Sequence, residues 1–173
     1  MWTPRHTEDI AELIARDPWR MRVLTVARSL DLPDWWIGAG FVRSAVWDAM
    51  HGYTEPTPLA DIDLIFFDTR DLDEETEKRH ERTLAERMPD APWSVTNQAR
   101  MHLANGDAPY TGSVDAFTRW PETATCIAAC LGSDDRPVVV APHGIRDLAQ
   151  LVVRMNPRFA RDASVFEQRV RTK

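Results

Sequence analysis

Asp61 and Asp63 are the residues whose type and spacing best suit metal chemistry in this sequence. They begin an apolar run, residues 62–67, which predicts a buried strand. Because alternate residues of a strand project to the same face, the two carboxylates should lie side by side while Ile62 and Leu64 enter the core. Two adjacent carboxylates repel one another unless a cation separates them. Mg²⁺ binds one or two carboxylates together with substrate phosphates and water, so the pair predicts a Mg²⁺ (or Mn²⁺) site.

A glycine turn precedes the acidic pair in the chain. Residues 35–37 predict a short strand that runs into Gly38 and Gly40, after which apolar residues recur at helical spacing. Glycines permit close approach of the backbone to a ligand, and the start of a helix presents N–H groups and a positive dipole end to phosphate. The turn therefore predicts a phosphate site that faces the metal site.

Each signal has a purely structural alternative. Asp61 can instead cap a turn that follows Pro58, and residues 38–40 can simply form a tight connection between a strand and a helix. The two signals occur together and in the order that a nucleotide site requires. We therefore interpret residues 37–67 as a nucleotide site, either present or ancestral.

Two helices are expected before the first strand. Thr7 is the predicted N-cap of the first, with acidic residues in its first turn. Asp17 and Pro18 suit the N-cap and first position of the second, which should end before Pro33.

A highly charged segment, residues 71–90, predicts a solvent-facing helix anchored by Leu84, Ala85 and Met88. Residues 93–97 alternate as a strand does, and residues 98–103 are expected to lead into a loop. Further strands are predicted at 121–131 and 137–141, joined by a hairpin at 132–135. An amphipathic helix is expected over 145–153. The basic tail, residues 158–173, predicts a short surface helix, with phosphate binding as the alternative.

Length and composition limit the class of protein. The 173 residues contain no repeat, no flexible linker and no apolar stretch able to span a bilayer, which predicts a single domain and no membrane partner. The predicted single domain has three expected parts: N-terminal helices (1–33), a sheet core (34–142) and a C-terminal helical segment (143–173). The N-terminus lacks the apolar region of a secretory signal, so we expect a cytoplasmic protein. A net charge of -6 makes a long nucleic acid an unfavourable partner.

The glycine turn and the acidic pair resemble the nucleotidyltransferase superfamily with the polymerase-beta-like fold. Ala39-Gly40-Phe41-Val42-Arg43-Ser44 is similar to the Gly-Gly-Ala-Val-Arg-Asp motif of the tRNA-nucleotidyltransferase and poly(A) polymerase branch, and Asp61-Ile62-Asp63 to its Asp-x-Asp motif. Segments 34–37, 60–63, 97–102, 120–125 and 141–148 resemble a group of small bacterial nucleotidyltransferase-like proteins of unassigned function. The resemblance covers roughly residues 10–160 and implies an α+β fold with a mixed central sheet flanked by helices.

The resemblance also implies a mechanism. Two metal ions held by Asp61, Asp63 and a third acid would align the α-phosphate of a nucleotide with an attacking hydroxyl group and release pyrophosphate. The third acid belongs on a neighbouring strand, where this chain offers the neutral Asn97. Asp115 is the other candidate, and its alternative role is that of an aspartate in a turn or at a helix start.

The candidate nucleotide-binding residues are Gly38, Ala39, Gly40, Arg43, Ser44, Asn97 and Arg100. Arg43 can reach a triphosphate or instead pair with Asp48 or Asp61. The polar run at 97–102 is interpreted either as a rim that contacts the substrate or as loop hydrogen bonding. His143 is expected in a turn.

Three further residues have structural interpretations. Cys126 and Cys130 match no zinc pattern and are expected in the core. Trp120 forms either a structural corner or an aromatic wall of the site.

Two functions follow from these expectations. The first is a metal-dependent nucleotidyltransferase that moves an NMP group from an NTP to a small-molecule or protein acceptor. The second is a nucleotide-binding or regulatory module that retains the fold without turnover, as the missing third acid suggests. A third interpretation, a purely structural role, requires that no nucleotide binds.

Overall fold

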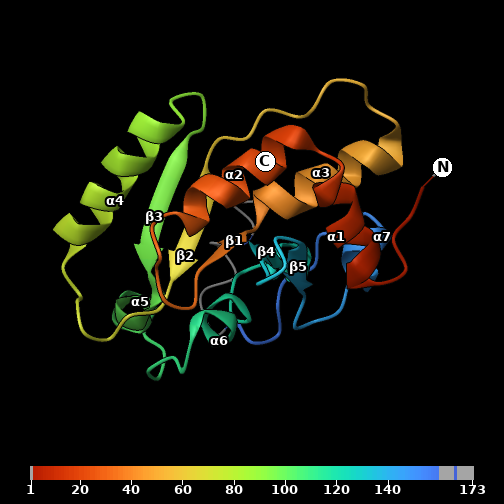
Figure 1. Ribbon diagram of the computed structural model, residues 1–173. Coiled ribbons are helices and arrows are strands. Elements are labelled where there is room, and N and C mark those ends of the chain that lie inside the picture. The colour runs from red at the N-terminus through yellow and green to blue at the C-terminus, as the bar shows by residue number, and fades with distance from the viewer. Residues whose placement is uncertain (1, 160–165, 167–173) are drawn as a thin grey trace.

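The computed structural model describes residues 2–159 and residue 166. Its centre is a five-stranded mixed sheet of order β3-β2-β1-β4-β5 (Figure 1). The strands are β1 (Trp36–Gly38), β2 (Ile62–Phe66), β3 (Trp93–Asn97), β4 (Ala128–Leu131) and β5 (Pro137–Val140). Only β2 and β3 pair in parallel, because α4 (Glu74–Arg87) carries the chain back between them. The observed α+β architecture with a mixed central sheet confirms the predicted fold class.

Four helices lie on one side of the sheet in Figure 1: α1 (Thr7–Ala15), α2 (Pro18–Arg28), α3 (Gly40–His51) and α4. On the other side lie the short α5 (Gln98–Asn105) and α6 (Ser113–Phe117), which leave much of that face uncovered. The 3₁₀ turn η1 (Thr123–Thr125) and α7 (Arg146–Ala149) are the remaining regular elements between residues 2 and 159.

The alternation of side chains along each strand separates the two faces of the sheet. On the face covered by four helices, Ile37, Leu64, Val95 and Val139 belong to the main hydrophobic core. On the opposite face, a smaller cluster contains Ile65, Ala128 and Phe117. The second face therefore has little apolar covering, and this is the face toward which Asp63 projects.

The helix starts show how local sequence sets the elements. Asp17 caps α2 as predicted, because its carboxylate accepts hydrogen bonds from the N–H groups of Trp19 and Arg20. The prediction for α1 was wrong by one residue: His6 is the N-cap, and Asp9 accepts a hydrogen bond from the His6 backbone N–H.

The charged helix α4 occurs where it was predicted, and Leu84 and Met88 bury as expected. Ala85 is exposed, contrary to prediction. Glu77 is buried instead, with only 4% of its surface exposed, because it is paired with charges and backbone donors from neighbouring elements. A buried charged residue cannot be recognised from a charged helical pattern alone.

The segment after β3 differs most from expectation. Residues 98–103, for which no helix was predicted, belong to α5, since Asn97 caps this helix by accepting a hydrogen bond from Ala99 N. Residues 121–127 contain the 3₁₀ turn, so the predicted strand begins only at Ala128. Helix α7 is also shorter than the predicted 145–153. Most of the basic tail lies outside the described residues. No helix within the described ranges is long and apolar enough to cross a membrane.

Candidate functional site

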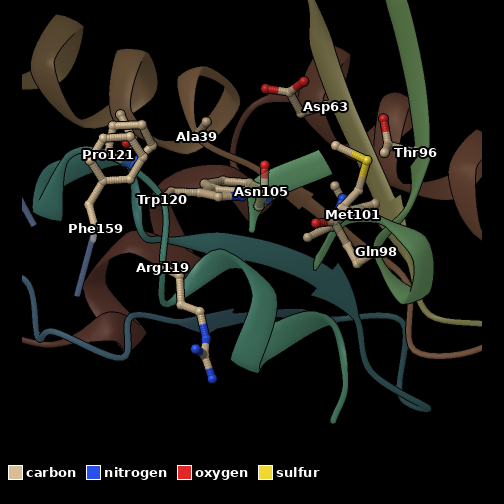
Figure 2. Close-up of a pocket in the computed structure, with 12 residues that line it drawn as sticks. Ala39, Asp63, Thr96, Gln98, Met101, Asn105, Arg119, Trp120, Pro121 and Phe159 are labelled. Atoms are coloured by element: carbon tan, nitrogen blue, oxygen red, sulfur yellow. The ribbon is translucent and has the colours of Figure 1, made fainter. Parts of the chain in front are cut away.

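A pocket of about 320 Å³ opens on the sparsely covered face of the sheet (Figure 2). Its walls come from the strands β2 and β3, helix α5 and the segment between α6 and β4. The lining residues are Ala39, Asp63, Ile65, Thr96, Gln98, Met101, Asn105, Arg119, Trp120, Pro121, Thr125 and Phe159. We call this the site pocket.

Asp63 is the carboxylate of the site pocket. It is half-buried on β2, and the parallel register sets it opposite Ser94 and sets Ile65 opposite Thr96. Paired residues of neighbouring strands project to the same face, so Asp63 and the Thr96 hydroxyl lie on one wall, as Figure 2 shows. Asp61 is exposed and lies just before β2, outside the pocket lining. Of the two predicted acids, Asp63 therefore lies in the pocket wall, whereas Asp61 lies outside the pocket lining, two positions earlier in the chain.

The glycine turn borders the same pocket. Strand β1 pairs with β2 in the register Trp36–Ile65 and Ile37–Leu64, and extending this register by one residue sets Gly38 opposite Asp63. Ala39 lines the pocket and adopts φ 50° and ψ -117°, which is close to the first central position of a type II′ turn. Alanine is small enough for this turn, but its backbone conformation is one that glycine prefers.

Helix α3 starts at this turn. Its first intrahelical donors are Val42 and Arg43, whose N–H groups both reach Ala39 O at 3.2 and 3.0 Å. The N–H groups of Gly40 and Phe41 precede them, at the positive end of a twelve-residue helix. Ser44 is buried one turn further on and does not line the site pocket.

Trp120 forms an aromatic wall of the site pocket, one of its two expected roles. The buried Asn156 holds the Trp120 backbone, because its amide donates to Thr118 O at 2.7 Å and to Trp120 O at 2.8 Å. The Trp120 ring also contacts Phe117, with centroids 5.7 Å apart. In the sequence, the lone Asn156-Pro157 pair gives no signal of this anchoring role.

Arg43 pairs with neither of its expected partners. Its guanidinium group lies 3.8 Å from the Glu122 carboxylate and stacks over the Trp47 ring at 5.2 Å. Asp48 instead accepts hydrogen bonds from Thr57. Arg43 is therefore held toward Glu122, the N-cap residue of η1, and it does not line the site pocket.

Asn97 and Arg100 also lie away from the pocket lining. Asn97 pairs with Phe66 in the parallel register, so it projects to the face opposite Asp63. The Asn97 side-chain amide forms hydrogen bonds with backbone atoms of Asp68 and Asp71, and it also caps α5. Arg100 forms bonds of 2.7 to 2.9 Å to Glu74 and Glu77. Both residues fasten α5 to α4 and to the loop after β2.

Asp115 lies in the first turn of α6, which was the alternative role weighed for it. Its carboxylate accepts a hydrogen bond from Thr111 N at 3.0 Å and pairs with Arg119 at 3.1 Å. These contacts lower the pKa of Asp115 against the opposing effect of its burial. Asp115 does not line the site pocket, and Figure 2 shows the Arg119 guanidinium group pointing away from the Asp63 wall.

Within the described residues, no three side chains of the His, Cys, Asp and Glu types lie together as a metal cluster. The residues beside Asp63 on β3 carry hydroxyl groups instead, Ser94 and Thr96. A single Mg²⁺ still fits this donor set, because that ion takes one or two carboxylates and fills its remaining positions with water and phosphate oxygens. A site for two metals would need a further acid.

The two cysteines are unsuited to nucleophilic chemistry. Cys126 is buried as expected, and burial raises the pKa of its thiol to about 12. Cys130 is only half-buried, and burial raises its pKa to about 11. His143 lies in a turn, as expected, and its Nε2 atom contacts Thr118 O at 2.8 Å.

Comparison with known proteins places this geometry in a family. A family model described as nucleotidyltransferase matches residues 25–173. An NMR structure described as revealing a CCA-adding enzyme head domain is 31% identical, with a TM-score of 0.86 over 99% of this chain and 91% of the other. A structure of a tRNA-processing enzyme is 20% identical, with a TM-score of 0.48 over 86% of this chain and 40% of its own. No curated protein matches. The chain is a member of the nucleotidyltransferase family.

Proposed function

We propose that this protein is a Mg²⁺-dependent nucleotidyltransferase that moves an NMP group from an NTP to a small-molecule or protein acceptor. The observation that supports this most directly is that Asp63 and the Ala39 turn border one pocket. A carboxylate for a cation and a helix start for phosphate then meet where a nucleoside triphosphate can lie between them.

Each of these residues has a separate task in the proposal. Asp63, with Asp61, would hold Mg²⁺ (or Mn²⁺). When bound, the ion would neutralise the triphosphate and make its α-phosphorus more electrophilic. The N–H groups of Gly40 and Phe41 would bind phosphate oxygens at the start of α3. An acceptor hydroxyl group would attack the α-phosphorus, forming a new ester bond as the bond to pyrophosphate breaks.

The arginines have a lesser part in this proposal. Arg43 and Arg100 would each have to leave a carboxylate partner before either could contact a triphosphate. Asp115, as a third acid, would similarly have to leave Arg119. The acceptor is proposed to be small or a protein, because the net charge of -6 disfavours a long polyanion.

The test is pyrophosphate release from each of the four NTPs with and without Mg²⁺, followed by mass spectrometry of a cell lysate incubated with labelled ATP. Asp63→Asn should reduce transfer at least 100-fold, because the neutral amide no longer balances the charge of the cation. Asp90→Asn is the matched control, since Asp90 is an exposed aspartate outside the site pocket. Equal activity of parent and Asp63→Asn proteins would contradict the proposal.

A second function is favoured by one observation, the lack of an acidic triad among the described residues. Under this alternative, the protein binds a nucleotide with Mg²⁺ and transfers nothing. An NTP that raises the melting temperature of the parent protein without pyrophosphate release or adduct would support it. If no nucleotide shifts the melting temperature, a purely structural role remains.

A further inference from the structure

Gln98 is a buried polar side chain in the site pocket. It is the first residue of α5, and only 5% of its surface is exposed. Among the residues that the structure describes, none forms a hydrogen bond with its side-chain amide, and Gln98 lines the site pocket. Its amide atoms are not buried unsatisfied atoms, so they reach the space of the pocket, where a ligand can form hydrogen bonds with them.

The position of Gln98 is fixed by its neighbours. Asn97 caps α5 through Ala99 N at 3.1 Å, and Arg100 binds the buried Glu77 at 2.7 and 2.8 Å. The two residues that flank Gln98 and Ala99 are thus tied to α4 and to the preceding loop. The Gln98 backbone has little freedom to carry its amide elsewhere.

The chemistry of an amide limits what it can bind. A glutamine side chain presents one acceptor and two donors in a single plane. Phosphate oxygens only accept hydrogen bonds, so they would leave the Gln98 carbonyl oxygen unpaired. The edge of a nucleobase presents donors beside acceptors, and glutamine pairs with such an edge through two hydrogen bonds.

The rest of the wall suits a planar ring. Trp120 offers an aromatic face and Met101 a polarisable thioether, and both line the site pocket with Gln98 (Figure 2). Bases stack well on aromatic side chains whatever their identity. An aromatic face and one in-plane amide together are the two elements of base recognition.

We infer that Gln98 reads the hydrogen-bonding edge of a nucleobase that lies against Trp120 in the site pocket. This inference rests on the proposed function, since it assigns the base-selecting residue of the same site. The base belongs either to the incoming NTP or to a nucleoside group of the acceptor. The chemistry of recognition is the same for both.

The test compares ligands with and without a base. Binding of the four NTPs and of inorganic tripolyphosphate, all with Mg²⁺, is measured by calorimetry for the parent protein, Gln98→Met and the control Gln150→Met. Gln150 is an exposed glutamine outside the site pocket. We expect Gln98→Met to weaken NTP binding about tenfold, the value of one or two hydrogen bonds, and to leave tripolyphosphate binding unchanged.

Stability gives an independent readout. If Gln98 served the fold, its loss would lower the melting temperature of the protein without ligand. We expect Gln98→Met to melt at or above the parent temperature, because methionine fills a similar volume without a polar group to satisfy. Gln98→Glu, which keeps the shape but loses the donor, provides a second variant with the same expected loss of base-dependent binding.

The outcomes separate the inference from the proposed function. If the parent protein binds neither NTPs nor tripolyphosphate, the proposed nucleotidyl transfer fails. If it binds NTPs and both Gln98 variants keep the parent ratio of NTP to tripolyphosphate affinity, only the role of Gln98 is overturned. Free nucleosides identify the source: competition with NTPs indicates the incoming base, and binding to the NTP-saturated protein that depends on Gln98 indicates the acceptor base.

Discussion

The ring of Trp120 lies directly over Gly38, so that a Cβ atom on Gly38 would come within 2.4 Å of Trp120 Cη2 and 2.8 Å of Cζ3. The missing side chain of Gly38 therefore makes room for the aromatic wall of the site pocket. Because the strand register sets Gly38 opposite Asp63, one glycine brings the indole next to the carboxylate strand.

Gly38→Ala should displace Trp120, because no real Cβ atom tolerates a contact of 2.4 Å. We expect a loss of about 1–3 kcal/mol in the free energy of unfolding, measured by chemical denaturation, together with altered tryptophan fluorescence. Gly40→Ala is the control, since its Cβ would meet only Leu59 Cδ2 at 3.9 Å. Equal destabilisation by both variants would contradict the close packing of Gly38.

Ala39→Gly should stabilise the protein by about 1 kcal/mol. The positive φ of 50° at Ala39 strains an L-residue, and glycine removes that strain at a smaller cost in chain entropy. The matched variant Ala49→Gly, in the body of α3, should instead destabilise by about 1 kcal/mol, since its helical backbone gains nothing from glycine. Thermal denaturation of both variants measures the difference, and a loss of stability in Ala39→Gly would argue against strain at the turn.

Glu77→Gln should destabilise the protein by about 3 kcal/mol. The Glu77 carboxylate is 4% exposed, accepts a hydrogen bond from Asn97 N at 2.9 Å and pairs with Arg100. Its neutral replacement leaves the largely buried guanidinium group of Arg100 with only the exposed Glu74 as a charged partner. The exposed Glu86 of the same helix supplies the control, Glu86→Gln, which should change the free energy of unfolding by less than about 0.5 kcal/mol.

His80 should make stability fall in mildly acidic solution. Burial first, and the charge of Arg79 second, lower the pKa of His80 below its ordinary 6.5, despite the opposing charges of Asp71 and Glu77. The unfolded chain therefore binds a proton at a higher pH than the folded protein, so stability is fully present above pH 6.5 and declines as the pH falls through the folded pKa. His80→Gln should flatten this slope, and NMR titration of the imidazole should give a pKa below 6.5.

Strand β2 and the start of α2 were predictable because their signals are local. Asp17 before Pro18 shows a helix start whatever the tertiary structure, and the apolar run after Asp61 shows a buried strand. The helix that begins at Gln98 was missed because its cap, Asn97, is itself the last residue of a strand. Because Asn97 ends β3 and also caps α5, the sequence around it shows neither a clear strand end nor a clear helix start.

The site was predictable in part. Asp63 and Ala39 do border one pocket, as their order in the chain suggested, whereas Arg43 and Arg100 pair with acids far away in sequence. Such pairs depend on which elements become neighbours, and the sequence of α4 gave no sign that Glu77 is buried. The face of the sheet to which the Asn97 side chain projects likewise depends on the parallel pairing of β3 with β2, which the sequence alone does not show.

The contact between α1 and β5 has a consequence for how the protein folds during synthesis. Ile10 and Ile14 of the first helix are fully buried in the same core as Val139 of the last strand. On the ribosome, α1 leaves the exit tunnel long before residues 137–140 exist, so the part of its apolar face that β5 covers stays unpaired until then, although α2 and α3 can already pack on the helix. The fold therefore closes late, when its first helix meets its last strand.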